Sequence, residues 1–362
     1  MQIKWIFFLL IVGLAGCGDQ PPSTMTEPTP ITSLLGLDAG GFATVTEPRV
    51  FSFPADHGPH PDYRTEWWYW TGNLTTADGR AFGYQFTIFR FAQASSMVPR
   101  SSAWASTETW LAHLTVSDIA GGKFYAFERS ARGAVGLAGA TSDPLRIHCD
   151  GWEAGGDPLR IHAETPELAL DLQLAAGKPL VLQGDHGLSR KGAAAGAASY
   201  YYSQTRMPTA GTLRLGDQRW SLTGNSWMDC EWATSSLEPG VSGWDWFALQ
   251  LADGRELMFY RLRRVDGSAT AFSSGSLVAV DGSVTSLSAA EVTLTDTAQW
   301  TSPTGVTYPV AWRLQVADLD LRITPRLANQ ELNLSVRYWE GAVAVSGSVA
   351  GVGYVELAGY SK

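Results

Sequence analysis

The stretch "WYWTGNLTTADGRAFGYQFTIFR" (residues 68–90) decides the fold, because two alternating runs of apolar and polar residues flank the tetrapeptide Ala-Asp-Gly-Arg at 77–80. Asp-Gly between such runs is typical of a tight β-hairpin. The pattern returns in "WDWFALQLADGRELMFYRLRR" (244–264), with the tetrapeptide at 252–255. A hairpin that recurs half a chain away indicates two related β units.

The rest of the chain supports this interpretation. Helical periodicity is nearly absent, and a second echo pairs "ELALDLQLAAGK" (167–178) with "DLDLRITPRLAN" (318–329). Beyond the N-terminal segment lie about 320 residues, more than one hydrophobic core usually serves. The sequence therefore predicts an all-β protein with two tandem antiparallel β-barrel domains, at 45–192 and 193–362, joined near the small-residue stretch "GAAAGAAS".

The N-terminus has the form of an export signal. "MQIKWIFFLLIVGLAGC" holds one lysine before an apolar run that is too short to span a bilayer. Leu14-Ala15-Gly16-Cys17 looks like a lipobox, which predicts a lipoprotein signal peptide at 1–17 with lipidation of Cys17. The alternative is an ordinary signal peptide with an incidental cysteine. Residues 18–44, rich in Pro, Thr, Ser and Gly, are expected to be a flexible tether from the bacterial envelope membrane, inner or outer, facing the periplasm.

Composition narrows the possible partners. The chain has 26 Lys+Arg against 35 Asp+Glu and contains no basic run, which argues against nucleic acid. The sequence does not decide whether Cys149 and Cys230 form a disulfide, because it does not show how close their Cα atoms lie. His57 and His60, in "DHGPH", lack a third imidazole nearby, so no metal site is expected. The sequence has no Gly-x-Ser-x-Gly, His-Glu-x-x-His, P-loop or Rossmann motif, and no cofactor is expected.

The first aromatic cluster is "PHPDYRTEWWYWTGNL" (59–74). In a strand, Glu66, Trp68 and Trp70 share one face, and the intervening aromatic residues share the other. Burying Glu66 among rings is costly unless the carboxyl is paired or protonated. Two interpretations stay open: an ion pair with nearby Arg64 inside the barrel, or a carboxyl of raised pKa in an apolar pocket.

A second cluster, "GNSWMDCEWATSS" (224–236), repeats the theme with two carboxylates. Asp229 and Glu231 share a face with Trp227, whereas Cys230 and Trp232 point to the opposite face. Two carboxyls beside an aromatic wall can serve as acid and base. Downstream, "GWDWFALQL" and "LMFYRLRR" add the pocket candidates Trp244, Trp246 and Tyr260.

Several motifs in order resemble the AttH/carotenoid 1,2-hydratase family. They include "HPDYRTEWWYWTGNL", "SWMDCEWATSSL", "GWDWFALQLADGRELMFYRLR" and "YWEGAVAVSGSVAGVGYVELAGY", and the resemblance covers about residues 45–362. It implies two lipocalin-like β-barrels. One branch of the family, hydroxyneurosporene synthase, adds water to a terminal double bond of acyclic carotenoids. Other members are exported proteins, some of which occur alongside ABC-transporter permeases.

The resemblance also implies roles for individual residues. The motif Asp-His-Asn-Trp of the hydratase branch falls on Asp229 and Trp232, and its tyrosine falls on Tyr260. In that chemistry a protonated carboxyl donates to an alkene, and aromatic faces stabilise the resulting cation. This chain has Cys230 where that branch has histidine, and a thiol is a poor proton shuttle near neutral pH. No aspartate accompanies Tyr260.

Three hypotheses follow. The first is an envelope lipoprotein that binds a hydrophobic lipid or isoprenoid, with an ABC-transporter permease as its candidate partner. The residues expected to bind this ligand are Trp68, Trp70, Trp227, Trp244 and Trp246, with Glu66 and Asp229 as polar anchors. The second is an enzyme, either a hydratase (a hydro-lyase) or a hydrolase. Its catalytic residues would be Asp229, Glu231, Trp232 and Tyr260. The third is an architectural factor whose barrels are filled by side chains.

Overall fold

The computed structural model describes residues 29–30, 40–96, 100–235 and 237–362. Cys17, the proposed signal peptide and most of the proposed tether lie outside these ranges. Within them, two antiparallel sheets account for the architecture, one a nearly closed barrel and the other a half-barrel, and the expected all-β class is confirmed. The one helix described is a 3-10 turn, η2 (Ala55–His57). No helix in the described ranges is both long and apolar enough to cross a membrane.

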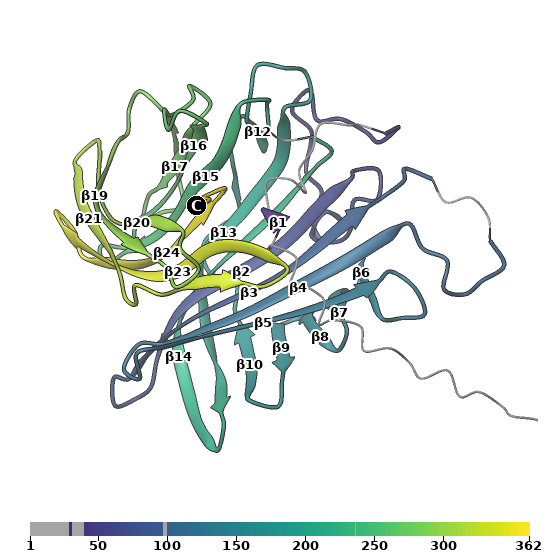
Figure 1. The fold of residues 1–362 in the computed structure, drawn as a ribbon, viewed down its shortest axis with the longest axis horizontal. Helices are drawn as coiled ribbons and strands as arrows, with labels where there is room; N and C mark the ends of the chain where they lie inside the picture. Colours follow the sequence, from purple (N-terminus) through teal and green to yellow (C-terminus); the bar gives the residue numbers. More distant parts are fainter. Residues whose placement is uncertain (1–28, 31–39, 97–99, 236) are drawn as a thin grey trace, which may run out of the picture.

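The first sheet has 13 strands in the order β5-β4-β3-β2-β14-β13-β10-β9-β8-β7-β6, with β11 and β12 also paired to β13 (Figure 1). Their bounds are β2 (Thr65–Thr75), β3 (Ala81–Ala92), β4 (Glu108–Asp118), β5 (Lys123–Arg132), β6 (Ala138–Ser142), β7 (Leu145–Cys149), β8 (Trp152–Gly155), β9 (Leu159–Glu164), β10 (Leu168–Leu174), β11 (Val181–Leu182), β12 (Leu188–Arg190), β13 (Ala198–Leu215) and β14 (Gln218–Ala233).

The second sheet has 11 strands in the order β18-β17-β16-β15-β24-β23-β21-β20-β19, with β1 and β22 also paired to β23. Their bounds are β1 (Thr29–Pro30), β15 (Val241–Leu251), β16 (Glu256–Arg264), β17 (Ser274–Val278), β18 (Val284–Ser288), β19 (Thr293–Thr301), β20 (Thr307–Val316), β21 (Leu319–Pro325), β22 (Glu331–Asn333), β23 (Val336–Gly347) and β24 (Gly351–Ala358). Strand β1, within the proposed tether, pairs in parallel with β23.

The duplicated hairpin is present in both sheets. β2 pairs with β3, and β15 pairs with β16, each across an Asp-Gly turn. Gly79 and Gly254 in these turns have φ of 86° and 88°, a region where only glycine is free of strain. In both sheets the first strand of this hairpin lies between its hairpin partner and the last long strand, β14 or β24. The two halves therefore share topology as well as sequence.

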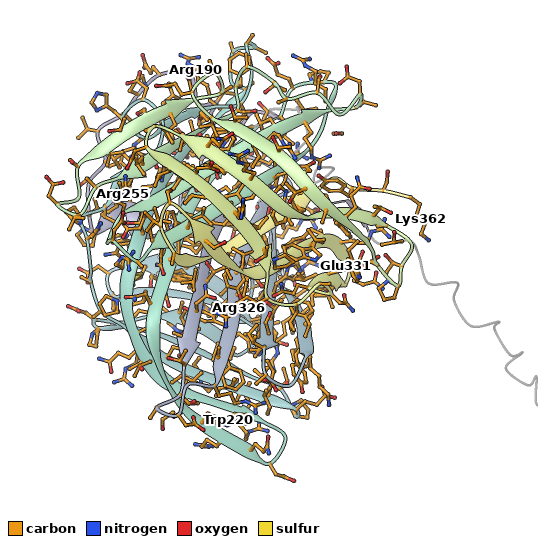
Figure 2. The ribbon with its side chains drawn as sticks, turned by 90° about the vertical axis from the view of Figure 1, so that its left-hand side faces the viewer. Arg190, Trp220, Arg255, Arg326, Glu331 and Lys362 are labelled. Carbon is orange, nitrogen blue, oxygen red and sulfur yellow. The ribbon has the colours of Figure 1, made fainter. Side chains whose placement is uncertain are left out.

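The division at 192/193 does not match the sheets. β13 and β14 are strands of the first sheet, so the two sheets separate between Ala233 and Val241. The small-residue stretch near 192–199 is a connection between β12 and β13 within the first sheet. Small residues are typical of linkers, which is why the sequence predicted one here; in the structure, alanine and glycine instead allow close packing. The long β13–β14 hairpin extends to a tip near Trp220 (Figure 2).

Each sheet has its own core, and the two sheets pack face to face. On β2, the side chains of Trp68 and Trp70 point into the core of the first sheet, whereas Tyr69 packs in a separate cluster with Trp246 of β15. Polar contacts also join the sheets: Ser117 donates to Gln330 at 2.6 Å, and His113 Nδ1 lies 2.7 Å from the Tyr338 hydroxyl. A strand covered on both sides explains the run of consecutive aromatic residues.

Candidate functional site

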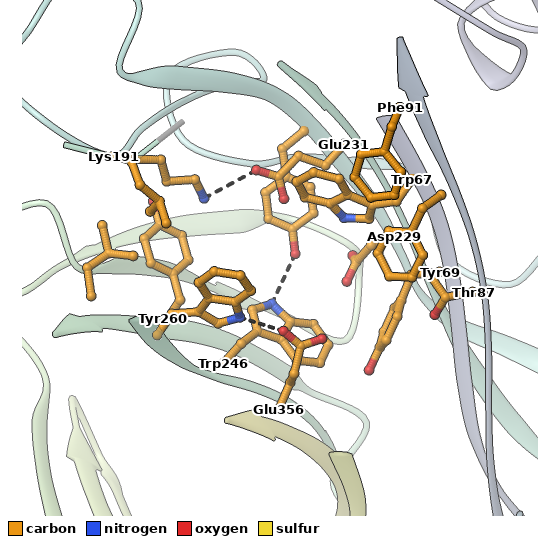
Figure 3. A pocket seen from close by; sticks show the side chains of 15 residues that line it. Trp67, Tyr69, Thr87, Phe91, Lys191, Asp229, Glu231, Trp246, Tyr260 and Glu356 are labelled. Atoms are coloured by element: carbon orange, nitrogen blue, oxygen red, sulfur yellow. Dashed lines mark hydrogen bonds and ion pairs between the residues drawn. The ribbon is translucent and has the colours of Figure 1, made fainter. Parts of the chain in front are cut away.

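A pocket lies between the two sheets, with side chains from both in its wall (Figure 3). Its cavity volume is about 100 Å³, and the empty space between its walls, including space open to solvent, is about 860 Å³. Its lining is mainly aromatic and aliphatic, with an amine and three carboxyl groups among the rings. The lining residues are Trp67, Tyr69, Thr87, Phe89, Phe91, Lys191, Tyr201, Asp229, Glu231, Leu237, Trp244, Trp246, Tyr260, Leu262 and Glu356.

Strand pairing places the polar groups of the first sheet. Asp229 of β14 lies opposite Tyr69 of β2, and Glu231 lies opposite Trp67. On its other side, Glu231 lies opposite Tyr201 of β13. Since alternate residues of a strand share a face, all five side chains project toward the second sheet. The local sequence thus builds one wall of the pocket from three neighbouring strands.

Asp229 is a buried carboxyl at the pocket wall. It is 3% exposed, and its Oδ1 accepts hydrogen bonds from Ser203 Oγ at 2.5 Å and Trp227 Nε1 at 2.8 Å. No described cation forms an ion pair with it. Burial raises its pKa to about 7, although the Ser203 and Trp227 hydrogen bonds oppose the shift. At neutral pH this carboxyl can therefore both donate and accept a proton.

Replacing Asp229 with asparagine is expected to change how stability depends on pH. Between the ordinary pKa of 3.8 and about 7, the folded chain keeps a proton that the unfolded chain has lost. The free energy of unfolding of wild type, relative to that of Asp229→Asn, therefore falls by about 1.4 kcal/mol per pH unit as pH rises through that window. Above the window the difference no longer changes with pH. Urea unfolding of both proteins across this range measures the difference. A difference that stays constant with pH would contradict the raised pKa.

Glu231, two residues further along β14 in the same wall, belongs to a charged cluster. Its Oε1 accepts a hydrogen bond from the Ser199 hydroxyl and lies 3.4 Å from Lys191 Nζ. The Lys191 ammonium sits 3.8 Å from the ring centroid of Tyr260, a cation–π distance. Burial favours the neutral amine, but the Glu231 charge outweighs it, so the pKa of Lys191 is raised. Lys191 is therefore a fixed cation.

The second sheet supplies the opposite wall. Trp246 Nε1 donates to the Tyr201 hydroxyl at 3.2 Å, and Trp244 Nε1 donates to Glu356 Oε1 at 2.5 Å (Figure 3). Glu356 of β24 lies opposite Glu340 of β23, which accepts a hydrogen bond from the Tyr69 hydroxyl at 2.6 Å. These contacts place two further carboxyls close to the pocket.

The predicted site residues divide between two places. Asp229, Glu231, Tyr260, Trp244 and Trp246 line the pocket, and Trp227 lies beside it as a donor to Asp229. Trp68, Trp70 and Trp232 instead lie in the core of the first sheet, and each is 0% exposed. They share a strand with pocket residues but project from its other face, so the structure does not bring them to the pocket.

Glu66 is also remote from the pocket, in an ion-pair network. Its carboxylate contacts His60 Nδ1 at 2.5 Å and Arg90 Nε at 3.2 Å, so its guanidinium partner is Arg90 rather than Arg64. His60 stacks on Trp232 with ring centroids 3.6 Å apart. Cys230 is buried on this same side, and both Cys149 and Cys230 are free thiols. The cysteine that replaces the hydratase histidine therefore does not face the pocket.

Several residues were missed from the sequence: the lining residues Trp67, Lys191, Tyr201 and Glu356, and also Glu340, which is buried behind the lining. Trp67 could have been found, because it alternates with Trp68 on a strand covered on both faces. The two glutamates could not, because their position depends on how the two sheets dock. In the described ranges, no group of three or more His, Cys, Asp or Glu residues could hold a metal ion.

Comparison with known proteins places this geometry in a family. The sequence pattern described as AttH-like matches residues 44–360. The crystal structure of a protein described as AttH from Nitrosomonas europaea is 33% identical, with a TM-score of 0.80, covering 88% of this chain and all of that one. Kievitone hydratase from Nectria haematococca has a TM-score of 0.65 at 16% identity, covering 88% of this chain and 96% of its own.

A third solved structure, CghA with Sch210972, has a TM-score of 0.53 at 13% identity, covering 89% of this chain and 97% of that one. At such identities, kievitone hydratase and CghA show a shared fold alone. Among proteins with curated descriptions, none matches this sequence. The AttH-like pattern spans nearly all of both sheets, and the Nitrosomonas structure is matched over its full length. The chain therefore belongs to the AttH-like family.

Proposed function

We propose that the protein binds a hydrophobic small molecule between its two sheets and catalyses addition or removal of water on it by acid–base chemistry. The observation that supports this most directly is Asp229, a buried carboxyl with a pKa of about 7 in an aromatic pocket. A general acid is most effective when its pKa lies near the working pH. Kievitone hydratase, a hydratase by name, has the same fold.

The proposed reaction uses residues on both walls. The Asp229 carboxyl gives its proton to one carbon of an alkene, and the π bond breaks to leave a cation on the other carbon. The faces of Tyr69 and Trp246, which lie near each other with ring centroids 5.3 Å apart, can stabilise that cation. Water then bonds to the cationic carbon, and the proton it releases returns to the Asp229 carboxylate. The product is an alcohol, and the acid is restored.

A second candidate is a carrier that binds the same kind of molecule without changing it. The N-terminal sequence favours this role, because a lipobox-like segment ending at Cys17 would anchor the protein in the bacterial envelope, facing the periplasm. In this proposal an ABC-transporter permease supplies or removes the hydrophobic molecule. Metabolic labelling with a fatty-acid analogue tests the anchor, since Cys17→Ser should abolish incorporation; equal labelling of both proteins would exclude it.

Replacing Trp67 with alanine is expected to weaken ligand binding about tenfold, because it removes a half-buried ring from the pocket wall. The matched control is Trp104→Ala, since Trp104 is 57% exposed and outside the lining. Mass spectrometry of molecules that co-purify from native membranes provides the ligand, and fluorescence titration measures its affinity. Absence of any co-purifying apolar molecule would count against ligand binding, and equal affinities of the two variants for a molecule that does co-purify would refute binding at this pocket.

A further inference from the structure

Two glutamates face each other at the base of the pocket wall formed by the second sheet. Glu340 and Glu356 are directly opposed on β23 and β24, so their side chains project from the same face. Glu340 is 0% exposed, and Glu356 is half-buried and lines the pocket. Opposed like charges destabilise a sheet, and burial adds to that cost. The arrangement therefore requires something that neutralises it.

Within the ranges that the structure describes, no ion pair joins a cation to either glutamate. Glu340 Oε1 accepts the Tyr69 hydroxyl at 2.6 Å, whereas Oε2 is buried and has no hydrogen-bond partner. Glu356 Oε1 accepts Trp244 Nε1 at 2.5 Å. The pocket's ammonium group, Lys191 Nζ, pairs with Glu231. Each carboxyl thus has one neutral donor and no counter-charge.

A shared proton accounts for these contacts. Two opposed carboxyls, one fully buried and one half-buried, strongly resist carrying two charges, and a single proton held between them would remove that repulsion. Burial and the neighbouring carboxyl hold the pKa of Glu340 well above its usual range, and burial raises the pKa of Glu356. The other titratable groups around the pair are Tyr69 of β2, Asp229 and Glu231 of β14, Tyr338 of β23, Tyr354 of β24 and Lys191 before β13.

The charges around the pocket have a consequence for its ligand. Three carboxyls line it, Asp229, Glu231 and Glu356, with Glu340 behind them and one ammonium that is already paired. An anionic ligand would meet uncompensated negative charge away from water, where such repulsion is strong. A neutral ligand with an oxygen atom can instead accept a hydrogen bond from a protonated carboxyl.

On these grounds we infer that the pocket selects uncharged apolar molecules bearing a hydrogen-bond-accepting oxygen, and excludes carboxylates such as fatty acids. The Glu340–Glu356 pair is the specificity determinant. This inference rests on the proposed function, because it concerns the ligand of the same pocket.

The test compares two isoprenoid probes of equal length, farnesol and farnesoic acid, by quenching of tryptophan fluorescence. At pH of about 8, wild type is expected to bind farnesol at least tenfold more tightly, a difference of about 1.4 kcal/mol. In Glu340→Gln/Glu356→Gln the preference should fall at least threefold, because the negative charge of the pair, which repels a carboxylate, is gone. The control Asp281→Asn/Glu291→Gln removes two exposed carboxyls from the second half and should keep the wild-type preference.

The outcomes separate the two proposals. Equal binding of both probes by wild type, or an unchanged preference in the glutamate variant, would overturn the inference on specificity. Failure to bind either probe would count against the proposed ligand pocket itself. Infrared spectroscopy of the wild-type protein needs no ligand and does not depend on whether a variant folds. At pH of about 8, where Asp229 is largely ionised, wild type should retain a protonated-carboxyl band. Absence of that band would overturn the shared proton.

Discussion

Replacing Arg90 with methionine is expected to lower the free energy of unfolding by about 3–5 kcal/mol. Arg90 is 1% exposed and donates hydrogen bonds to the Glu66 carboxylate at 3.2 Å and to the backbone oxygens of His60 and Tyr63 at 2.8 Å each. Methionine fills much of the same space but leaves the 0% exposed Glu66 without its guanidinium. The cost comes mainly from the lost ion pair, since His60 alone then contacts the Glu66 carboxylate, and from the Tyr63 backbone oxygen, which loses its donor.

An exposed ion pair in the same sheet provides the control. Arg146 binds Glu153 at 2.9 Å, with the two side chains 54% and 44% exposed. Arg146→Met should cost less than about 1 kcal/mol, because solvent already screens the pair. Equilibrium unfolding in urea measures both values. Equal losses for Arg90→Met and Arg146→Met would show that the buried network contributes no more to stability than a surface pair.

Replacing Asp229 with asparagine is expected to reduce turnover of the pocket's substrate by about 10²–10⁴-fold. Asparagine keeps the size and can still accept hydrogen bonds from Ser203 and Trp227, but it has no proton to give to an alkene. Ligand affinity should change little, since Asp229 is one of many lining residues. A loss of turnover at constant affinity is characteristic of a group that acts in the transition state.

Asp171→Asn is the matched control, because Asp171 is exposed on β10, away from the pocket. Turnover is followed by mass spectrometry as a gain or loss of one water, using the molecule that co-purifies with wild type. Wild-type turnover in Asp229→Asn would exclude Asp229 as the acid. If wild type binds this molecule but leaves its mass unchanged, the carrier role is favoured instead.

The sequence predicted what depends on local pattern. The Asp-Gly hairpins, their duplication and the faces of Trp227, Asp229 and Glu231 follow from strand alternation, which a short stretch records. The division at 192/193 was wrong because β13 and β14 pair with β2 and β10, and such pairings between distant segments leave no local mark.

The same distinction applies to the pocket. Alternation showed that Trp68 and Trp67 face opposite ways, but not which of them faces a cavity. The sequence-based expectation favoured the side of Trp68 and Glu66, which the structure shows to be core. Docking of the second sheet decides the matter, since it brings Glu356 and Trp246 opposite Asp229 and Trp67 in one pocket. That docking depends on the shape and charge of segments that lie far apart in the sequence.

Strand β2 serves two compartments at once, which constrains how the gene can vary. Insertion or deletion of one residue within 65–75 would turn every side chain beyond the change to the opposite face of the strand. Trp68 and Trp70 would then face the pocket, and Trp67 and Tyr69 would face the core of the first sheet. Both the packing of the core and the shape of the pocket would change. We therefore expect length differences among relatives to accumulate in the exposed hairpin turns, and β2 to keep a constant length.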